Sequence, residues 1–91
     1  MAPNHLNDKF RHLKTGFTYE VIQAFTDYDG REHPVGEEWL FIGSNFLPYE
    51  DGVSLFVSYE GQGRYIRLQH RPETQGAILD HLEAYIQRQD R

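Results

Sequence analysis

Two aspartates and a glycine in FTDYDGREHPVGEEW, residues 25–39, have the spacing with which a calcium-binding loop begins. Such a loop needs oxygen ligands at its first, third and fifth positions and a glycine at the sixth. With Asp27 first, Asp29 stands at the third position. Arg31 and Glu32 follow at the fifth and sixth, where a ligand and a glycine are required. The sequence therefore argues against calcium, and we predict no metal site here.

Other kinds of catalytic chemistry find little support in the residue pattern. The chain has no cysteine, which excludes a thiol nucleophile and a cysteine-based zinc site. The five histidines are scattered, and none forms the His and Glu arrangement that zinc hydrolases carry on a helix. Gly43-Ser44 lacks the strand–turn–helix context of a nucleophile elbow. We predict no catalytic residue and no cofactor.

Tyrosines beside acidic residues are the remaining candidates for function. A tyrosine next to an Asp-Gly pair occurs twice, in TDYDG and in PYEDG. Tyrosine supplies rigid contact area with a polar tip, and carboxylates steer oppositely charged partners. We predict that a partner-binding rim is formed by six residues: Asp27, Tyr28, Asp29, Tyr49, Glu50 and Asp51.

The charge distribution indicates what such a partner would be. Residues 26–63 hold eight acids and one base, Arg31, within a chain of net charge -5. An acidic middle repels phosphate backbones, so we expect no nucleic-acid binding. The sequence predicts a non-enzymatic module that binds a basic protein or peptide. The alternative for the acids is that they only keep the loops solvated.

Two other functions stay open. An inhibitor or immunity-type protein that blocks a basic enzyme would also be small and acidic. A small-ligand or metal-dependent enzyme would need a deep pocket with convergent polar groups, which the sequence does not indicate.

Period-two patterns predict an antiparallel sheet over residues 17–70. β-branched and aromatic residues mark four strands, at residues 17–25, 37–43, 53–59 and 64–70, with a short fifth around residues 45–49. Asp29-Gly30, Asp51-Gly52 and Gly61-Gln62-Gly63 mark the turns between them. Short connections between successive strands predict a meander.

The two ends of the chain show helical spacing. Leu6, Phe10 and Leu13 predict a short helix within the N-terminal segment, residues 1–16. After Pro72 an apolar stripe with helical spacing predicts an amphipathic helix over residues 72–89; the stripe is Ile78, Leu79, Leu82, Tyr85 and Ile86. The predicted fold class is thus α+β, a curved sheet of four or five strands with a helix at each end.

The 91 residues are expected to form a single domain, residues 1–91, as a monomer or weak homodimer. The N-terminal stretch MAPNHLNDKFRHLK has no apolar run, and no segment is apolar enough to span a membrane. We therefore expect a soluble cytoplasmic protein without membrane contact.

Two stretches resemble SH3 domains. AFTDY (24–28) is similar to the motif that opens the first long SH3 loop, and VGEEWLFI (35–42) is similar to the diverging turn. The resemblance implies an SH3-like partial barrel. Thr26 stands where a ligand-binding tyrosine is expected, and the paired tryptophans are missing. Peptide-binding roles would carry over only to Asp27 and Tyr28.

A second resemblance covers most of the chain. The series HLKTGFTYEVIQAFTDYDG, HPVGEEWLFIG and NFLPYEDGVSLFV, followed by the C-terminal apolar stripe, resembles a family of small bacterial proteins known as a domain of unknown function. The resemblance implies a bacterial source and brings no activity, cofactor or catalytic residue.

Overall fold

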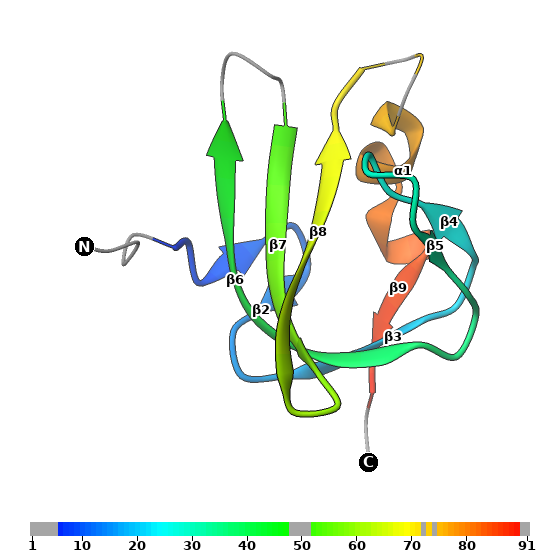
Figure 1. The fold of residues 1–91 in the computed structure, drawn as a ribbon. Coiled ribbons are helices and arrows are strands. Elements are labelled where there is room, and N and C mark those ends of the chain that lie inside the picture. The colour runs from blue at the N-terminus through cyan, green and yellow to red at the C-terminus, as the bar shows by residue number, and fades with distance from the viewer. Residues whose placement is uncertain (1–5, 48–51, 72, 74, 90–91) are drawn as a thin grey trace.

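The computed structural model describes residues 6–47, 52–71, 73 and 75–89. Strands dominate this part of the chain, and they lie mainly in one antiparallel sheet with the order β8-β7-β6-β3-β9 (Figure 1). The elements are β1 (Lys9–Phe10), β2 (Leu13–Lys14), β3 (Thr18–Val21), β4 (Phe25–Thr26), β5 (Glu32–His33), β6 (Glu38–Leu47), β7 (Gly52–Tyr59), β8 (Gln62–Gln69), α1 (Gly76–Asp80), a 3-10 turn (Leu82–Ala84) and β9 (Ile86–Arg88).

The predicted meander is confirmed for β3, β6, β7 and β8, because each pairs antiparallel with the next along this series. A separate fifth strand was expected around residues 45–49. For residues 45–47 this expectation is wrong, because they belong to β6, which runs without interruption through Leu47. Residues 48 and 49 lie outside the described residues. The pairing of β6 with β7 shifts register between Phe41 and Gly43. Such a bulge bends the sheet, and Figure 1 shows β6 curving toward β3.

The core lies on the concave side of this sheet. Alternate residues along each strand are buried there, as period two requires. Tyr19 and Val21 of β3, Trp39 and Phe41 of β6, and Val53, Leu55 and Val57 of β7 are all buried. Ile66 and Leu68 continue the same layer on β8. Phe17, just before β3, is 42% exposed.

The predicted N-terminal helix is wrong. The segment forms a hairpin of β1 and β2, with Arg11 in the turn at a φ of 55°. An isolated helix this short is marginal, because few hydrogen bonds offset its nucleation. The hairpin instead buries Leu13 fully and places the backbone N–H of Lys14 2.7 Å from the Tyr19 hydroxyl, to which it donates.

The predicted C-terminal helix over residues 72–89 is also wrong, and with it the α+β, SH3-like fold class. The helical part is α1, a little more than one turn, and the 3-10 turn after it. β9 then pairs antiparallel with β3, and Ile86 lies opposite Val21. This strand satisfies the backbone groups along an edge of β3 that a helix would leave unpaired.

The apolar stripe was nevertheless a correct sign of burial. Leu79, Leu82 and Ile86 are buried, and Ile78 and Tyr85 pack against the core. No helix in the described part of the chain is long and apolar enough to cross a membrane.

Candidate functional site

The loop between β4 and β5 is built around the side chain of Asp27. This carboxylate is 2% exposed, and its Oδ1 accepts hydrogen bonds from the backbone N–H groups of Asp29 at 2.9 Å and Arg31 at 3.0 Å. Gly30 has a φ of 85°, which confirms the turn predicted at Asp29-Gly30. Such a φ favours glycine. The loop is therefore held in one shape by a buried side chain rather than by its length alone.

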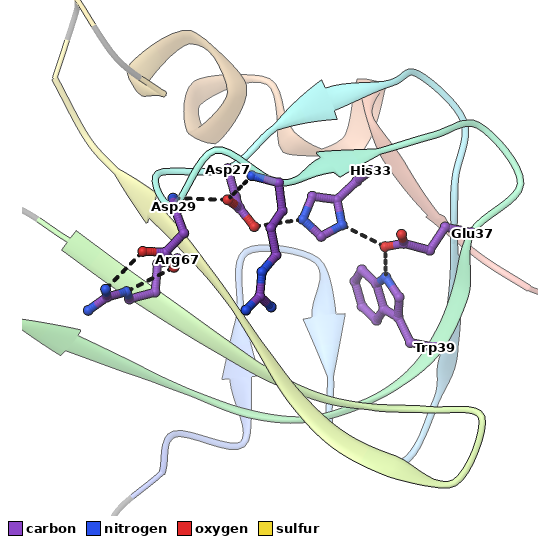
Figure 2. A network of polar contacts seen from close by, with 7 residues as sticks. Asp27, Asp29, His33, Glu37, Trp39 and Arg67 are labelled. Atoms are coloured by element: carbon purple, nitrogen blue, oxygen red, sulfur yellow. Dashed lines mark hydrogen bonds and ion pairs between the residues drawn. The ribbon is translucent and has the colours of Figure 1, made fainter.

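A chain of polar contacts continues from Asp27 toward the sheet (Figure 2). Oδ2 of Asp27 lies 2.8 Å from Nε2 of His33, and Nδ1 of His33 lies 2.7 Å from Oε2 of Glu37. The same Oε2 accepts a hydrogen bond from the indole N–H of Trp39 at 3.1 Å. The ring of Phe25 stacks on His33 with centroids 4.8 Å apart. We call Asp27, His33, Glu37 and Trp39 the His33 network.

The donor and acceptor count restricts what His33 can do. An ionised carboxylate only accepts hydrogen bonds, whereas a neutral imidazole has one donor and one acceptor. Two carboxylates are satisfied together when both ring nitrogens of His33 carry hydrogen. Both nitrogens already have partners inside the protein, so neither faces a substrate as a general base would. This arrangement fixes the loop against β6.

Tyr28 is an exposed member of the predicted rim. Its side chain is 50% exposed, while its backbone N–H donates to the carbonyl oxygen of Arg67 on β8 at 2.7 Å. Asp29 lies beside it and receives two hydrogen bonds from the Arg67 guanidinium, at 2.9 and 3.2 Å. The hydrogen bonds from Arg67 hold the pKa of Asp29 below its usual value; burial opposes this lowering, and the charges of Arg67 and Arg31 add to it.

The structure thus separates the six predicted residues. Tyr28 and Asp29 lie at the surface, whereas the carboxylate of Asp27 faces inward and is used by the loop itself. Tyr49, Glu50 and Asp51 lie outside the described residues. Within the described ranges, no group of three or more histidine or acidic side chains is arranged to hold a metal ion.

His33 and Glu37 were not singled out from the sequence. The signal that could have found them is the strand register, which places His33 opposite Phe25 across the β4–β5 pair. Residues directly opposite each other share a face of the strand pair, and both Phe25 and His33 are buried. A buried histidine needs hydrogen-bond partners, which directs attention to the acidic residues close to it in the chain.

A small pocket opens beside the His33 network. It has a volume of about 90 Å³, and its walls include His33 and Glu37 on one side and Tyr59, Arg64 and Ile66 on the other. Ligand pockets for drug-sized molecules usually have at least about 300 Å³. The pocket therefore has room for one side chain of a partner rather than for a cofactor.

Comparison with known proteins gives a family and a structural relative. A family model described as a domain of unknown function (DUF3601) matches residues 2–90. A solved structure of an integron cassette protein from the mobile metagenome of Vibrio cholerae is 38% identical in sequence, with a TM-score of 0.93. The match covers 98% of this chain and 99% of that one. No curated protein shows significant similarity to the chain.

Proposed function

The chain belongs to this family of domains of unknown function, and we propose that it acts as a non-enzymatic binding module for a partner protein or peptide. The binding surface is the β4–β5 loop with Tyr28 and the neighbouring edge of β8. The observation that carries the proposal is that an exposed tyrosine ring stands on a loop whose backbone is fixed from inside by Asp27.

A fixed loop favours binding for an energetic reason. Ordering a flexible loop on association costs free energy, and a loop that is already ordered avoids that cost. The Tyr28 backbone is held to β8 through Arg67, and the adjacent Asp29 is held by the Arg67 side chain. The ring of Tyr28 is thus presented on a rigid support, as binding residues commonly are.

The His33 network supports a binding role over proton transfer. Its histidine and its carboxylates are consumed by contacts to one another and to the indole of Trp39. The pocket beside it is small. These features suit a structural support for a surface, and the small pocket gives a substrate little space.

A basic partner is the choice that the charges favour. The net charge is -5, and residues 26–63, which include this loop, hold eight acids and one base. Their field steers a cationic partner to the surface, and salt weakens that attraction over roughly 10 Å. We expect the complex to form faster at low ionic strength.

The test compares capture by three forms of the full chain. Wild type, Tyr28→Ala and Val35→Ala are immobilised, exposed to lysate of the bacterium that carries the gene, and the retained proteins are identified by mass spectrometry. Val35 is the matched control, because it is 63% exposed and lies in the turn after β5. We expect a partner that wild type and Val35→Ala retain and Tyr28→Ala loses.

Equal retention by Tyr28→Ala would contradict the proposed surface. A basic enzyme retained in a one-to-one ratio, and inactive while bound, would instead make the protein an inhibitor.

A further inference from the structure

The outer edge of β8 is divided into a covered part and an open part. β8 pairs with β7 on one side only, with Arg67 opposite Ser54, Tyr65 opposite Phe56 and Gly63 opposite Ser58. The carbonyl of Arg67 points away from β7, because it accepts from Tyr28. Backbone groups of an antiparallel strand alternate in direction with a period of two. The N–H and C=O groups of Tyr65 and Gly63 therefore point outward as well.

The part of this edge at Arg67 and Gln69 is covered by other groups of the protein. The backbone N–H of Tyr28 donates to the outward-facing carbonyl oxygen of Arg67. The carbonyl of Gln69 accepts from the backbone N–H groups of Arg71 and Gln75, and the N–H of Gln69 donates to the Gln75 side chain at 3.1 Å. In the described part of the chain, no such backbone partner reaches the outward groups of Gly63 and Tyr65.

The pocket beside the His33 network lies directly along this open part. Arg64, Tyr65 and Ile66 of β8 all line it. Trp39 and Tyr59 contribute ring surface. Val57 and Ile66, both buried, add aliphatic surface. An uncharged aliphatic side chain therefore suits the pocket better than a charged one.

We propose that the open edge of β8 binds an extended peptide segment of the partner, which adds a short strand beside Gly63 and Tyr65. One aliphatic side chain of this segment, opposite Arg64, enters the pocket. Backbone hydrogen bonds provide affinity, and the pocket selects the side chain, as in other complexes formed by strand addition. This inference rests on the proposed function and names the kind of segment that the module binds.

The geometry favours a single peptide strand over a second copy of the chain. Symmetric pairing of two β8 strands needs a free edge on both sides of the pairing centre. Among the described residues, this edge is free at Gly63 and Tyr65, and the β4–β5 loop is bonded to it at Arg67. A single added strand needs no more of the edge than these two residues. The short contact predicts weak binding, with a Kd on the order of 0.1 mM.

The probe is the peptide acetyl-Lys-Val-Leu-Val-Lys-amide with a fluorescent label, titrated with the full chain and followed by anisotropy. In the proposed register the central leucine faces the pocket, and the two valines lie opposite Tyr65 and Gly63. Replacing the leucine with aspartate or lysine should weaken binding at least about tenfold, because a charge loses its water in the pocket. Equal or tighter binding of either charged peptide would overturn the pocket assignment.

Backbone methylation gives the matched control without altering the protein. N-methylation of both valines removes the donors that face β8 and should weaken binding at least about tenfold. N-methylation of the leucine, whose N–H faces away, should leave most of the affinity. Hydrogen exchange at the amides of Gly63 and Tyr65 should slow when the unmethylated peptide binds. Insensitivity to the valine methyl groups would refute strand addition.

Two further outcomes separate this inference from the proposed function. In the first, the capture experiment yields a partner whose binding depends on Tyr28 but which excess peptide does not displace. This result would support the proposed binding function and reject the strand-addition site. A chain that is dimeric by light scattering, with Gly63 and Tyr65 amides protected only at high protein concentration, would assign the edge to a second copy and reject the peptide.

Discussion

Asp27 is the residue on which the β4–β5 loop depends most. It accepts two backbone hydrogen bonds and contacts His33, and it is 2% exposed. Removing a buried acceptor leaves its hydrogen-bond donors unsatisfied, which commonly costs about 1–3 kcal/mol for each buried group. The free energy of unfolding for a chain of this size is only about 5–14 kcal/mol.

We expect Asp27→Ala to lower the free energy of unfolding by about 3 kcal/mol, and Asp27→Asn by about 1–2 kcal/mol. Asparagine keeps an oxygen for the two backbone donors and can offer an N–H to a neutral His33, so its loss is smaller. Urea unfolding followed by circular dichroism measures both values. Asp8→Ala is the control, because Asp8 is exposed. Equal costs at Asp8 and Asp27 would show that the network does not stabilise the loop.

The pair between Asp29 and Arg67 predicts a dependence on pH. Its hydrogen bonds hold the pKa of Asp29 in the folded chain below the ordinary value of 3.8. A carboxylate whose pKa falls on folding contributes stability above its unfolded pKa, and that contribution is lost as the pH falls through the lowered value. Near neutral pH, Asp29→Asn should therefore be less stable than wild type, by at most about 1 kcal/mol for an exposed pair.

This difference should shrink as the pH falls below 3.8, when wild type loses the charge as well. Urea unfolding of both proteins along a pH series measures it. Glu83→Gln serves as the control for loss of an exposed charge, since Glu83 lies at the surface in the 3-10 turn. A difference that stays constant into acid would mean that the charge of Asp29 is not what stabilises the pair.

The sequence predicted the turn at this site but not the contacts that hold the loop to the rest of the fold. The Asp-Gly pair and the exposed Tyr28 follow from local chemistry, which needs only neighbouring residues. The contacts of Asp27 with His33 depend on the pairing of β4 with β5, and those of Asp29 depend on β8, 38 residues later along the chain. Spacing in the sequence does not contain that information.

At the scale of elements, the four strands of the meander were predictable, whereas the elements near the two ends of the chain were not. The strands of the meander show period two and end at turn residues, and both signals are local. The stripe from Ile78 to Ile86 was read as one helix because burial recurred at helical spacing. A short helix, a 3-10 turn and a strand bury the same residues, and the pairing of β9 with β3 decides between these alternatives.

Gly76 provides a test of this C-terminal arrangement through the sign of one substitution. In a regular exposed helix, Gly→Ala stabilises by up to about 1 kcal/mol. Here a Cβ on Gly76 would stand 2.7 Å from the carbonyl oxygen of Arg71, a backbone atom that cannot turn away. We expect Gly76→Ala to destabilise the protein by about 1–3 kcal/mol, as overpacking does.

Thermal unfolding measures this change. Ala77→Gly in the same helix is the control, since Ala77 is exposed and should lose only about 1 kcal/mol of helix propensity. A Gly76→Ala protein that is more stable than wild type would instead support the longer helix predicted from the sequence.

At the scale of the whole molecule, segments near the two ends of the chain contact each other and the sheet. β9 forms the last strand of the sheet, beside β3 (Figure 1). Nε2 of His12 lies 2.6 Å from the carbonyl oxygen of Ile86, a contact between residues 74 positions apart. The side-chain amide of Gln89 donates to Glu20 at 2.6 Å and to Glu38 at 2.8 Å, which joins β3 and β6. Stability therefore depends on residues near the C-terminus.

We expect Ile86→Ala to lower the free energy of unfolding by about 2–5 kcal/mol, because Ile86 is fully buried and its removal leaves a cavity. Gln87→Ala, on the exposed side of the same strand, should cost less than about 0.5 kcal/mol. Denaturant unfolding compares the two. Similar small losses for both would mean that β9 is not part of the cooperative core.

The indole of Trp39 has an optical consequence. It is the sole tryptophan of the chain, it is 3% exposed, and it borders the pocket while donating to Glu37. All tryptophan fluorescence therefore comes from one place, the wall shared by the core and the proposed peptide site. Its emission wavelength reports unfolding when water reaches the ring, and its intensity reports an occupant of the pocket while the fold stays intact. The protein thus carries its own label for distinguishing a ligand that binds from a change that denatures.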